Sequence, residues 1–340
     1  MIILPPRLIK KVYSLPETTL DIHATQSETI QTRWTVWDKE VADNDFQINV
    51  VRHQITRNLE TLTPLMADEL KRGFDRWWGG EDDAREWKEV KVWDACLKLI
   101  AGASNGAFCG APLCEFKEIR LQESDLFSSD PSLGYVDALR DEASSVFAKA
   151  GGSWTRDAVR DLKLIDSTIR ESMRLNPFAI VGLPRTVVHP EGIKLPVSGV
   201  HVAKGTMIAV PMEPIHYDES IYPQARKFNA FRFADPSNIT NIVDNFTAKD
   251  ELEAEKADAT EKKAKSTATL DDAFLGFGFG RHACPGRFFA LNEMKIFIAH
   301  MLLNYDVEHM AIRPRPLDTV WLKLPLHGGK IRVRRRTSVI

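Results

Sequence analysis

The sequence predicts a mainly α protein with a small β portion. Apolar residues recur at helical spacing in three long stretches, 90–103, 159–175 and 290–305, which indicates helices with one buried face. Residues 178–213 instead combine valine and isoleucine with proline and glycine at short intervals, a composition typical of short strands joined by turns. We therefore expect a helical body that carries a small sheet.

Length and composition narrow the class of protein. A chain of 340 residues is long enough for one large domain or two smaller ones. Its net charge of -2 gives no sign of nucleic-acid binding. Four cysteines without a CxxC pair favour neither a zinc site nor a disulfide scaffold, so we expect an intracellular protein. No run of about eighteen apolar residues occurs, and we expect no encoded transmembrane helix or membrane anchor.

Two helices are expected in the first third of the chain. Thr63-Pro64 predicts the start of the first, because proline is tolerated in the first turn of a helix. The second covers 90–103 and ends before Asn105-Gly106. Three cysteines in this region are interpreted as small buried hydrophobic residues: Cys96, Cys109 and Cys114.

The middle of the chain predicts two further helices. Asp130-Pro131 indicates the start of one, and Gly151-Gly152 indicates its end. The next runs from Val159 to Leu175, where Asn176-Pro177 stops it. Residues 249–269 are rich in Lys, Glu, Asp and Ala and contain no aromatic residue, so we interpret them as a solvated insertion and not as a site.

The end of the chain predicts strands. Residues 322–326 and 331–333 flank His327-Gly328-Gly329, a pattern that predicts a hairpin. The basic stretch 330–336 indicates a charged edge strand more than a nucleic-acid motif.

The stretch from Phe277 to Gly286 carries the strongest chemical signal. Its glycines permit close approach of the backbone to a bulky group. Cys284 stands just ahead of a predicted helix, whose dipole favours a thiolate, and a thiolate suits a metal such as iron. A glycine-rich turn with an inert cysteine is the alternative for these residues alone. The whole stretch resembles the haem-binding signature of the cytochrome P-450 family.

That resemblance implies roles for the residues of the stretch. Cys284 would be the axial ligand of the iron in haem b, and Phe277 would pack near its thiolate. The N–H of Gly286 would adjust the donor strength of the Cys284 sulfur. His282 stands where the family usually has an arginine and would donate to a haem propionate. The form Arg-His-Ala-Cys-Pro-Gly-Arg-Phe-Phe is similar to that of fungal members that oxidise terpenoid and indole-terpenoid compounds.

A second motif concerns structure. Glu171 and Arg174 are neighbours on a helix at i and i+3, and Glu171-Ser172-Met173-Arg174 resembles the E-x-x-R motif of the family. The run 228–233 resembles its Phe-x-Pro-x-Arg-Phe segment, with Ala230 in place of proline. The resemblance implies that Arg232 completes a buried Glu-Arg-Arg cluster, which would hold the cysteine loop.

Further basic residues are propionate candidates by resemblance. Arg185 matches a strand position where the family often has such a group. His53 and Arg57 resemble a Trp-x-x-x-Arg helix with histidine in place of tryptophan, although this spacing is equally common on solvent faces.

The oxygen-activating helix of the family has no counterpart in the sequence. Two segments are superficially similar to its acid and threonine motif, 151–155 and 101–105, but both lack the acid, and we reject them. We therefore identify no catalytic residue. The expected organisation is an N-terminal helical part (1–114), a junction where central helices are missing (115–125) and a haem-binding C-terminal part (126–340) with the charged insertion at about 249–269. The resemblance therefore leads us to expect a truncated cytochrome P-450 fold, shortened at its N-terminus and internally.

The resemblance implies a haem-thiolate monooxygenase that oxidises a lipophilic, terpenoid-like secondary metabolite in a fungal pathway. It would use dioxygen and electrons from an NADPH-dependent reductase, and members of the family are usually anchored to the endoplasmic reticulum. Because the oxygen-activating helix is missing, two alternatives stay open. They are a non-catalytic or impaired haem-binding remnant and an incomplete gene model.

Overall fold

The computed structural model describes most of the chain, and the described residues are 1–38, 44, 46–83, 86–108, 131–237, 264–310, 317–324 and 329–337. The predictions for Cys109, Cys114 and the junction 115–125 lie outside these residues. The same holds for 249–263, the larger part of the charged insertion.

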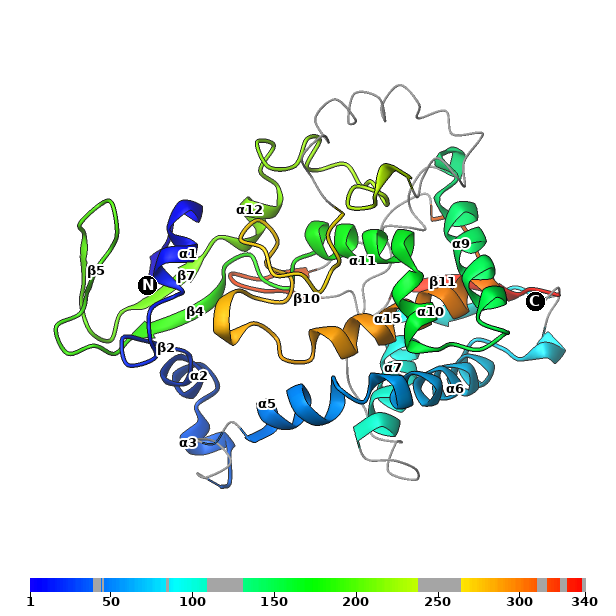
Figure 1. Ribbon diagram of the computed structural model, residues 1–340, viewed down its shortest axis with the longest axis horizontal. Coiled ribbons are helices and arrows are strands. Elements are labelled where there is room, and N and C mark those ends of the chain that lie inside the picture. Colours follow the sequence, from blue (N-terminus) through cyan, green and yellow to red (C-terminus); the bar gives the residue numbers. More distant parts are fainter. Residues whose placement is uncertain are drawn as a thin grey trace.

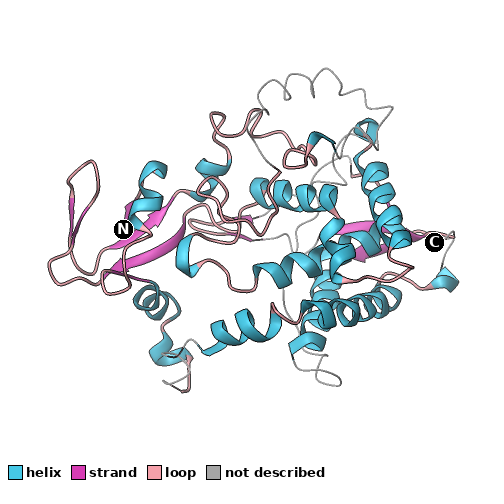
Figure 2. Ribbon diagram, in the orientation of Figure 1, coloured by secondary structure: helices cyan, strands magenta, loops and turns pink. Residues whose placement is uncertain are grey.

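The described elements form a helical body and small sheets, as the sequence predicts (Figure 2). The α-helices are α1 (Ile9–Val12), α2 (Ile22–Ile30), α3 (Thr32–Thr35), α5 (Phe46–Val50), α6 (Leu59–Trp77), α7 (Val92–Phe108), α9 (Tyr135–Lys149), α10 (Arg156–Asp161), α11 (Lys163–Leu175), α12 (Met212–His216) and α15 (Arg287–Asn304). The strands are β1 (Ile2–Ile3), β2 (Leu20–Asp21), β3 (Lys88–Lys91), β4 (Gly182–Val187), β5 (Ile193–Lys194), β6 (His201–Val202), β7 (Met207–Val210), β8 (Tyr305–Val307), β9 (Leu317–Asp318), β10 (Lys323–Leu324) and β11 (Lys330–Arg335).

Two hydrophobic cores organise the molecule. The larger core lies among α6, α7, α9, α10, α11 and α15, at the end of the molecule that carries the C-terminus (Figure 1). The smaller core packs α1 against a sheet with strand order β1-β7-β4-β2, near the N-terminus. In this sheet β1 runs parallel to β7, whereas β4 is antiparallel to both of its neighbours. The described residues between β7 and α15 contribute to both cores: Met212, Ile215 and Leu275 to the smaller one, and Ala230, Phe231 and Ala268 to the larger one.

Helix α15 lies at the centre of the helical body. It contacts α6, α7, α9, α10 and α11, and its side chains are buried on almost every face, as expected for a helix surrounded by other elements. Neither α15 nor any other described helix combines the length and the apolar character that crossing a membrane requires.

Several helix boundaries differ from the prediction. Helix α7 continues through Asn105-Gly106 to Phe108, and α9 begins at Tyr135, after a 3-10 turn at Pro131–Leu133. Helix α6 begins at Leu59 and contains Pro64, so Thr63-Pro64 does not mark its start. The predicted helix 159–175 is interrupted at Leu162, whose ψ of 82° separates α10 from α11. The physical reason is a cap from another helix. The Glu142 carboxylate of α9 accepts hydrogen bonds from the first three N–H groups of α11, at 2.7, 2.7 and 3.0 Å.

The predictions for the C-terminal strands are wrong. Strand β10 pairs with β9, so 322–326 and 331–333 do not form a hairpin. Strand β11 is the central strand of a sheet with order β3-β11-β8, and it is not an edge strand. Val333 is fully buried, and the buried Arg335 donates to Asp75 at 2.7 Å, so the basic tail contributes to the core.

The charged insertion also ends earlier than predicted. Thr267 and Ala268 fall within the range 249–269, yet both are buried. The Thr267 N–H donates to the Asp166 carboxylate of α11 at 2.7 Å. The sequence could not reveal this contact, because the two residues are about a hundred positions apart.

Candidate functional site

The cysteine loop, residues 276–286, connects the two cores. Leu275 before it is fully buried in the smaller core, and Phe289 after it belongs to the larger one. Gly278 and Gly280 adopt φ values of 79° and 72°, which side-chain-bearing residues rarely adopt. The N–H of Cys284 donates to the carbonyl of Phe277 at 2.8 Å and closes the loop. The thiol is therefore presented at a fixed point of the backbone.

Cys284 has a free, exposed thiol at the N-terminal end of α15. Arg287, the first residue of this helix, donates from its guanidinium to the Cys284 carbonyl at 3.1 Å. Burial lowers the pKa of Arg287, while the nearby Cys284 acts in the opposite direction. Arg287 therefore ties the first turn of α15 to the backbone of the cysteine loop.

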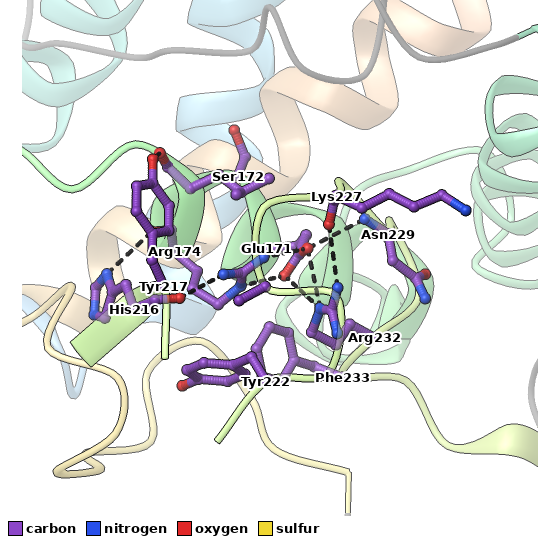
Figure 3. Close-up of polar contacts among 12 residues, drawn as sticks. Glu171, Ser172, Arg174, His216, Tyr217, Tyr222, Lys227, Asn229, Arg232 and Phe233 are labelled. Atoms are coloured by element: carbon purple, nitrogen blue, oxygen red, sulfur yellow. Dashed lines mark hydrogen bonds and ion pairs between the residues drawn. The ribbon is translucent and has the colours of Figure 1, made fainter. Parts of the chain in front are cut away.

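The Glu171 carboxylate lies between two arginines in the interior (Figure 3). Arg174 binds both of its oxygens, each at 2.8 Å. The Nε of Arg232 lies 3.1 Å from each oxygen, and the N–H of Asn229 donates to Oε1 at 3.1 Å. Glu171 and Arg174 have no exposed surface, so this cluster is a desolvated ion-pair network.

The Glu171 cluster holds the loop that contains Arg232. The guanidinium of Arg232 also donates to the carbonyls of Pro223, at 2.7 Å, and Lys227, at 3.1 Å. On the other side, Arg174 donates to the carbonyl of His216 at 2.5 Å. The structure thus brings together the three residues that the two motifs single out, and they connect α11 to the segment 216–232.

A second set of contacts, absent from the sequence predictions, clamps the segment before the cysteine loop to α11. Asp166 lies 3.0 Å from the ammonium of Lys295 and accepts hydrogen bonds from Thr267. Burial raises the pKa of Asp166, but Lys295 and the Thr267 hydrogen bonds outweigh burial and lower it. Arg170 lies 3.9 Å from the centre of the Phe274 ring, a cation–π contact. In the sequence, Asp166 and Arg170 directly follow Ile165 and Ile169 of the predicted apolar stripe, and this placement is the signal from which their burial could have been predicted.

Arg185 is a buried cation that forms no ion pair with a carboxylate among the described residues, although the charge of Asp21 acts on it. It is only 4% exposed, and its guanidinium donates to the carbonyl of Pro184 at 2.8 Å. Burial lowers its pKa. His282 lies close enough for the charge of Arg185 to act with burial in lowering the pKa of the imidazole. The Nε2 of His282 is 3.0 Å from Glu17, without hydrogen-bond alignment.

His53 and Arg57 are exposed and make no described contact with the cysteine loop. His53 lies in the π-helical turn Val51–Ile55 after α5, and Arg57 lies just beyond it; this turn is nevertheless close to the loop. Arg52 donates to the carbonyl of Arg281 at 3.2 Å, and a Cβ placed on Gly286 would lie 3.5 Å from Val51. The structure therefore brings this turn to the loop through neighbouring residues.

The two segments that we rejected as oxygen-activating motifs have structural roles. Thr155 is the N-cap of α10, where its hydroxyl accepts from the N–H of Ala158 at 3.2 Å. Ser104 of α7 donates to the buried Glu293 carboxylate of α15, at 3.0 Å to each oxygen. Burial raises the pKa of Glu293 to about 8, although the Ser104 hydrogen bond opposes the shift.

Comparisons with known proteins identify the class of this fold and site. The family model for cytochrome P450 matches residues 133–333, which include the Glu171 cluster and the cysteine loop. The chain is 35% identical to cytochrome P450 monooxygenase okaG of Penicillium ochrochloron over 456 residues, which cover 99% of this chain and 84% of the relative. The chain therefore belongs to the cytochrome P450 family, whose members carry haem.

Two further relatives are also named as monooxygenases of this family. Cytochrome P450 monooxygenase htyF of Aspergillus rugulosus is 26% identical, with 96% of this chain and 63% of the relative covered. Cytochrome P450 monooxygenase gloP of Glarea lozoyensis is 37% identical over 62% of this chain and 38% of its own length. The chain is thus a family member of the monooxygenase type. Its alignment with okaG is longer than its own 340 residues, so that relative carries internal segments that this chain lacks.

Proposed function

We propose that this chain is a haem-thiolate monooxygenase in which Cys284 is the axial ligand of haem b. The observation that carries this proposal is the exposed thiol at the head of α15, on a loop anchored in both cores. We further propose a lipophilic, terpenoid-like substrate, which the resemblance of residues 281–289 supports, and an NADPH-dependent reductase as the source of electrons.

The residues around the loop fit haem. A single thiolate is a suitable iron ligand, and the described residues contain no alternative group of three His, Cys, Asp or Glu side chains for a metal ion. Arg185 offers a buried guanidinium that lacks a described carboxylate partner, and a propionate would provide one. We propose His282 as a second propionate contact. We also propose Arg57 and His53 as propionate contacts. The hydrogen bond from Arg52 to the carbonyl of Arg281 supports this, because it places their segment beside the cysteine loop.

Bound haem would supply the chemistry that activates dioxygen. The residues of the chain would prepare its proximal side. Arg287 would hold the backbone of Cys284 through the hydrogen bond from its guanidinium to the carbonyl of that residue. Phe277 would shield the sulfur from water, and the N–H of Gly286 would donate toward it. The Glu171 cluster would keep the loop that presents the sulfur in place.

A second candidate function is haem binding without efficient turnover. It is favoured by the longer alignment with okaG, because segments of that relative have no counterpart here. It is also favoured by Thr155, which is occupied as an N-cap and lies in a turn between two helices. In this case the chain would bind haem but would not couple electron transfer to oxidation of a substrate.

The carbon monoxide difference spectrum of the reduced, purified chain tests the proposal. We expect a thiolate-type Soret band that is lost in Cys284→Ala. A band that persists in this variant would overturn the assignment of Cys284 as the ligand. If the wild-type chain did not incorporate haem, the proposal that it is a haem-thiolate monooxygenase would be overturned. Oxygen consumption with a reductase and a panel of terpenoids then separates the two candidates. Product formation supports the monooxygenase, whereas release of peroxide alone supports the protein without efficient turnover.

A further inference from the structure

His216 joins the Glu171 cluster to the cysteine loop. It is the last residue of α12 and has no exposed surface. Its Nε2 receives the N–H of Leu275 at 2.9 Å, and its Nδ1 lies 3.1 Å from the carbonyl of Arg174. Figure 3 shows the imidazole beside Arg174, at the edge of the cluster. One side chain thus touches both the helix that carries the cluster and the residue that precedes the loop.

These two contacts fix the tautomer of the imidazole. A backbone N–H can only donate, so Nε2 must carry a lone pair toward Leu275. A carbonyl can only accept, so the proton must be on Nδ1 and directed toward Arg174. The neutral Nδ1–H form satisfies both groups. In a protonated ring, the N–H at Nε2 would point at the N–H of Leu275.

The surroundings of His216 favour this neutral form. The ring stacks on Phe274, with centroids 5.6 Å apart and planes 11° apart. Two positive groups of α11 act on it, Arg174 and Arg170, while the Arg174 carbonyl opposes them. Burial is the largest effect, and it lowers the pKa of His216 to about 4.

We propose that His216 is a positioning residue, which holds the backbone at Leu275 so that the loop presents Cys284 in the geometry that a haem iron requires. The inference rests on the proposed role of Cys284 as the ligand. The Leu275 N–H belongs to the residue that opens the turn, because its carbonyl accepts from Gly278 at 2.9 Å. Without His216, this buried N–H would lose its acceptor, and the start of the loop could shift.

Three substitutions in the full chain separate the two contacts. His216→Gln keeps an acceptor near the position of Nε2 and can still receive the Leu275 N–H. His216→Asn is shorter, so it can reach only the Arg174 carbonyl. His216→Phe keeps an aromatic ring against Phe274 but removes both hydrogen bonds. His300→Phe is the matched control, because His300 is a buried histidine of the larger core that packs against Phe74.

The first measurement is amide hydrogen exchange at Leu275 in the haem-free chain. We expect slow exchange in wild type and His216→Gln, and exchange about tenfold faster in His216→Asn and His216→Phe, as loss of one hydrogen bond predicts. If an unstable variant cannot be measured, wild type still decides, since unprotected exchange at Leu275 would overturn the inference.

The second measurement is the fraction of bound haem that gives the thiolate band with carbon monoxide. We expect it to fall in His216→Asn and His216→Phe and to be retained in His216→Gln and His300→Phe. A full thiolate fraction in His216→Phe would overturn the positioning role. If wild type itself gives no thiolate band, the proposed function fails, and that result is distinct from a failure of the His216 variants alone.

Discussion

Glu171→Gln tests the buried cluster most directly. The substitution keeps the size of the side chain but removes the negative charge that Arg174 and Arg232 share, whose nitrogens approach it at 2.8 to 3.1 Å. Both guanidinium groups would stay buried, and the new amide would direct N–H groups toward other donors. Loss of one partner from a buried ion pair costs about 3–5 kcal/mol of unfolding free energy. Urea unfolding of the full chain, followed by circular dichroism, measures this loss.

A matched control is available on α10. Arg160 and Asp157 have the same i,i+3 spacing and a similar distance, 3.0 Å, but their side chains are 68% and 75% exposed. Because water screens this pair, Arg160→Gln should cost less than about 1 kcal/mol. If Glu171→Gln cost no more than Arg160→Gln, burial would not be the source of the stability of the cluster, and the reasoning would be refuted.

Three further predictions concern pH, a second ion pair and a backbone conformation. The pKa of His216, about 4, and of His300, about 3, are lowered chiefly by burial, so the unfolded chain binds more protons below pH 6.5 and stability falls as pH falls. Each histidine should lower the free energy of unfolding by about 2 kcal/mol between pH 7 and 5. The free energy of unfolding of His300→Phe, measured in urea, should therefore depend less steeply on pH than that of wild type, and an unchanged slope would contradict this. Lys295→Met should lower the free energy of unfolding by about 3 kcal/mol, because Asp166 would stay buried without its cation. The same substitution should cost less in a chain that already carries Asp166→Asn, and a double-mutant cycle that shows no coupling between the two would argue against the ion pair. Gly278→Ala should lower the free energy of unfolding by about 1–2 kcal/mol, because Gly278 has a positive φ. Gly102→Ala in α7 should raise it, because Gly102 is in a helix and a Cβ there would meet no atom within 4 Å beyond the backbone of its own helix. Equal melting temperatures for the two variants would disprove the contrast.

Local patterns predicted the helices and the β segment because their causes are local. Residue spacing fixes which side chains share a helix face, and within the predicted β segment Gly199 and Gly205 both adopt a positive φ, which tight turns between short strands often require. The break at Leu162 could not be predicted, because the carboxylate that caps α11 belongs to Glu142 of another helix. Similarly, alternation along 330–336 reveals a strand but not its neighbours, and pairing with both β3 and β8 makes β11 central.

The sequence by itself determined the cysteine, its glycines and the helix behind it, since these depend on short-range geometry. It also indicated that Glu171 and Arg174 are neighbours on a helix. The tertiary structure decided that this pair is buried while Asp157 and Arg160, at the same spacing, are exposed. It also decided that His216 receives the N–H of Leu275, 59 positions away. Such contacts depend on how two cores pack against each other, and no local pattern in the chain encodes that packing.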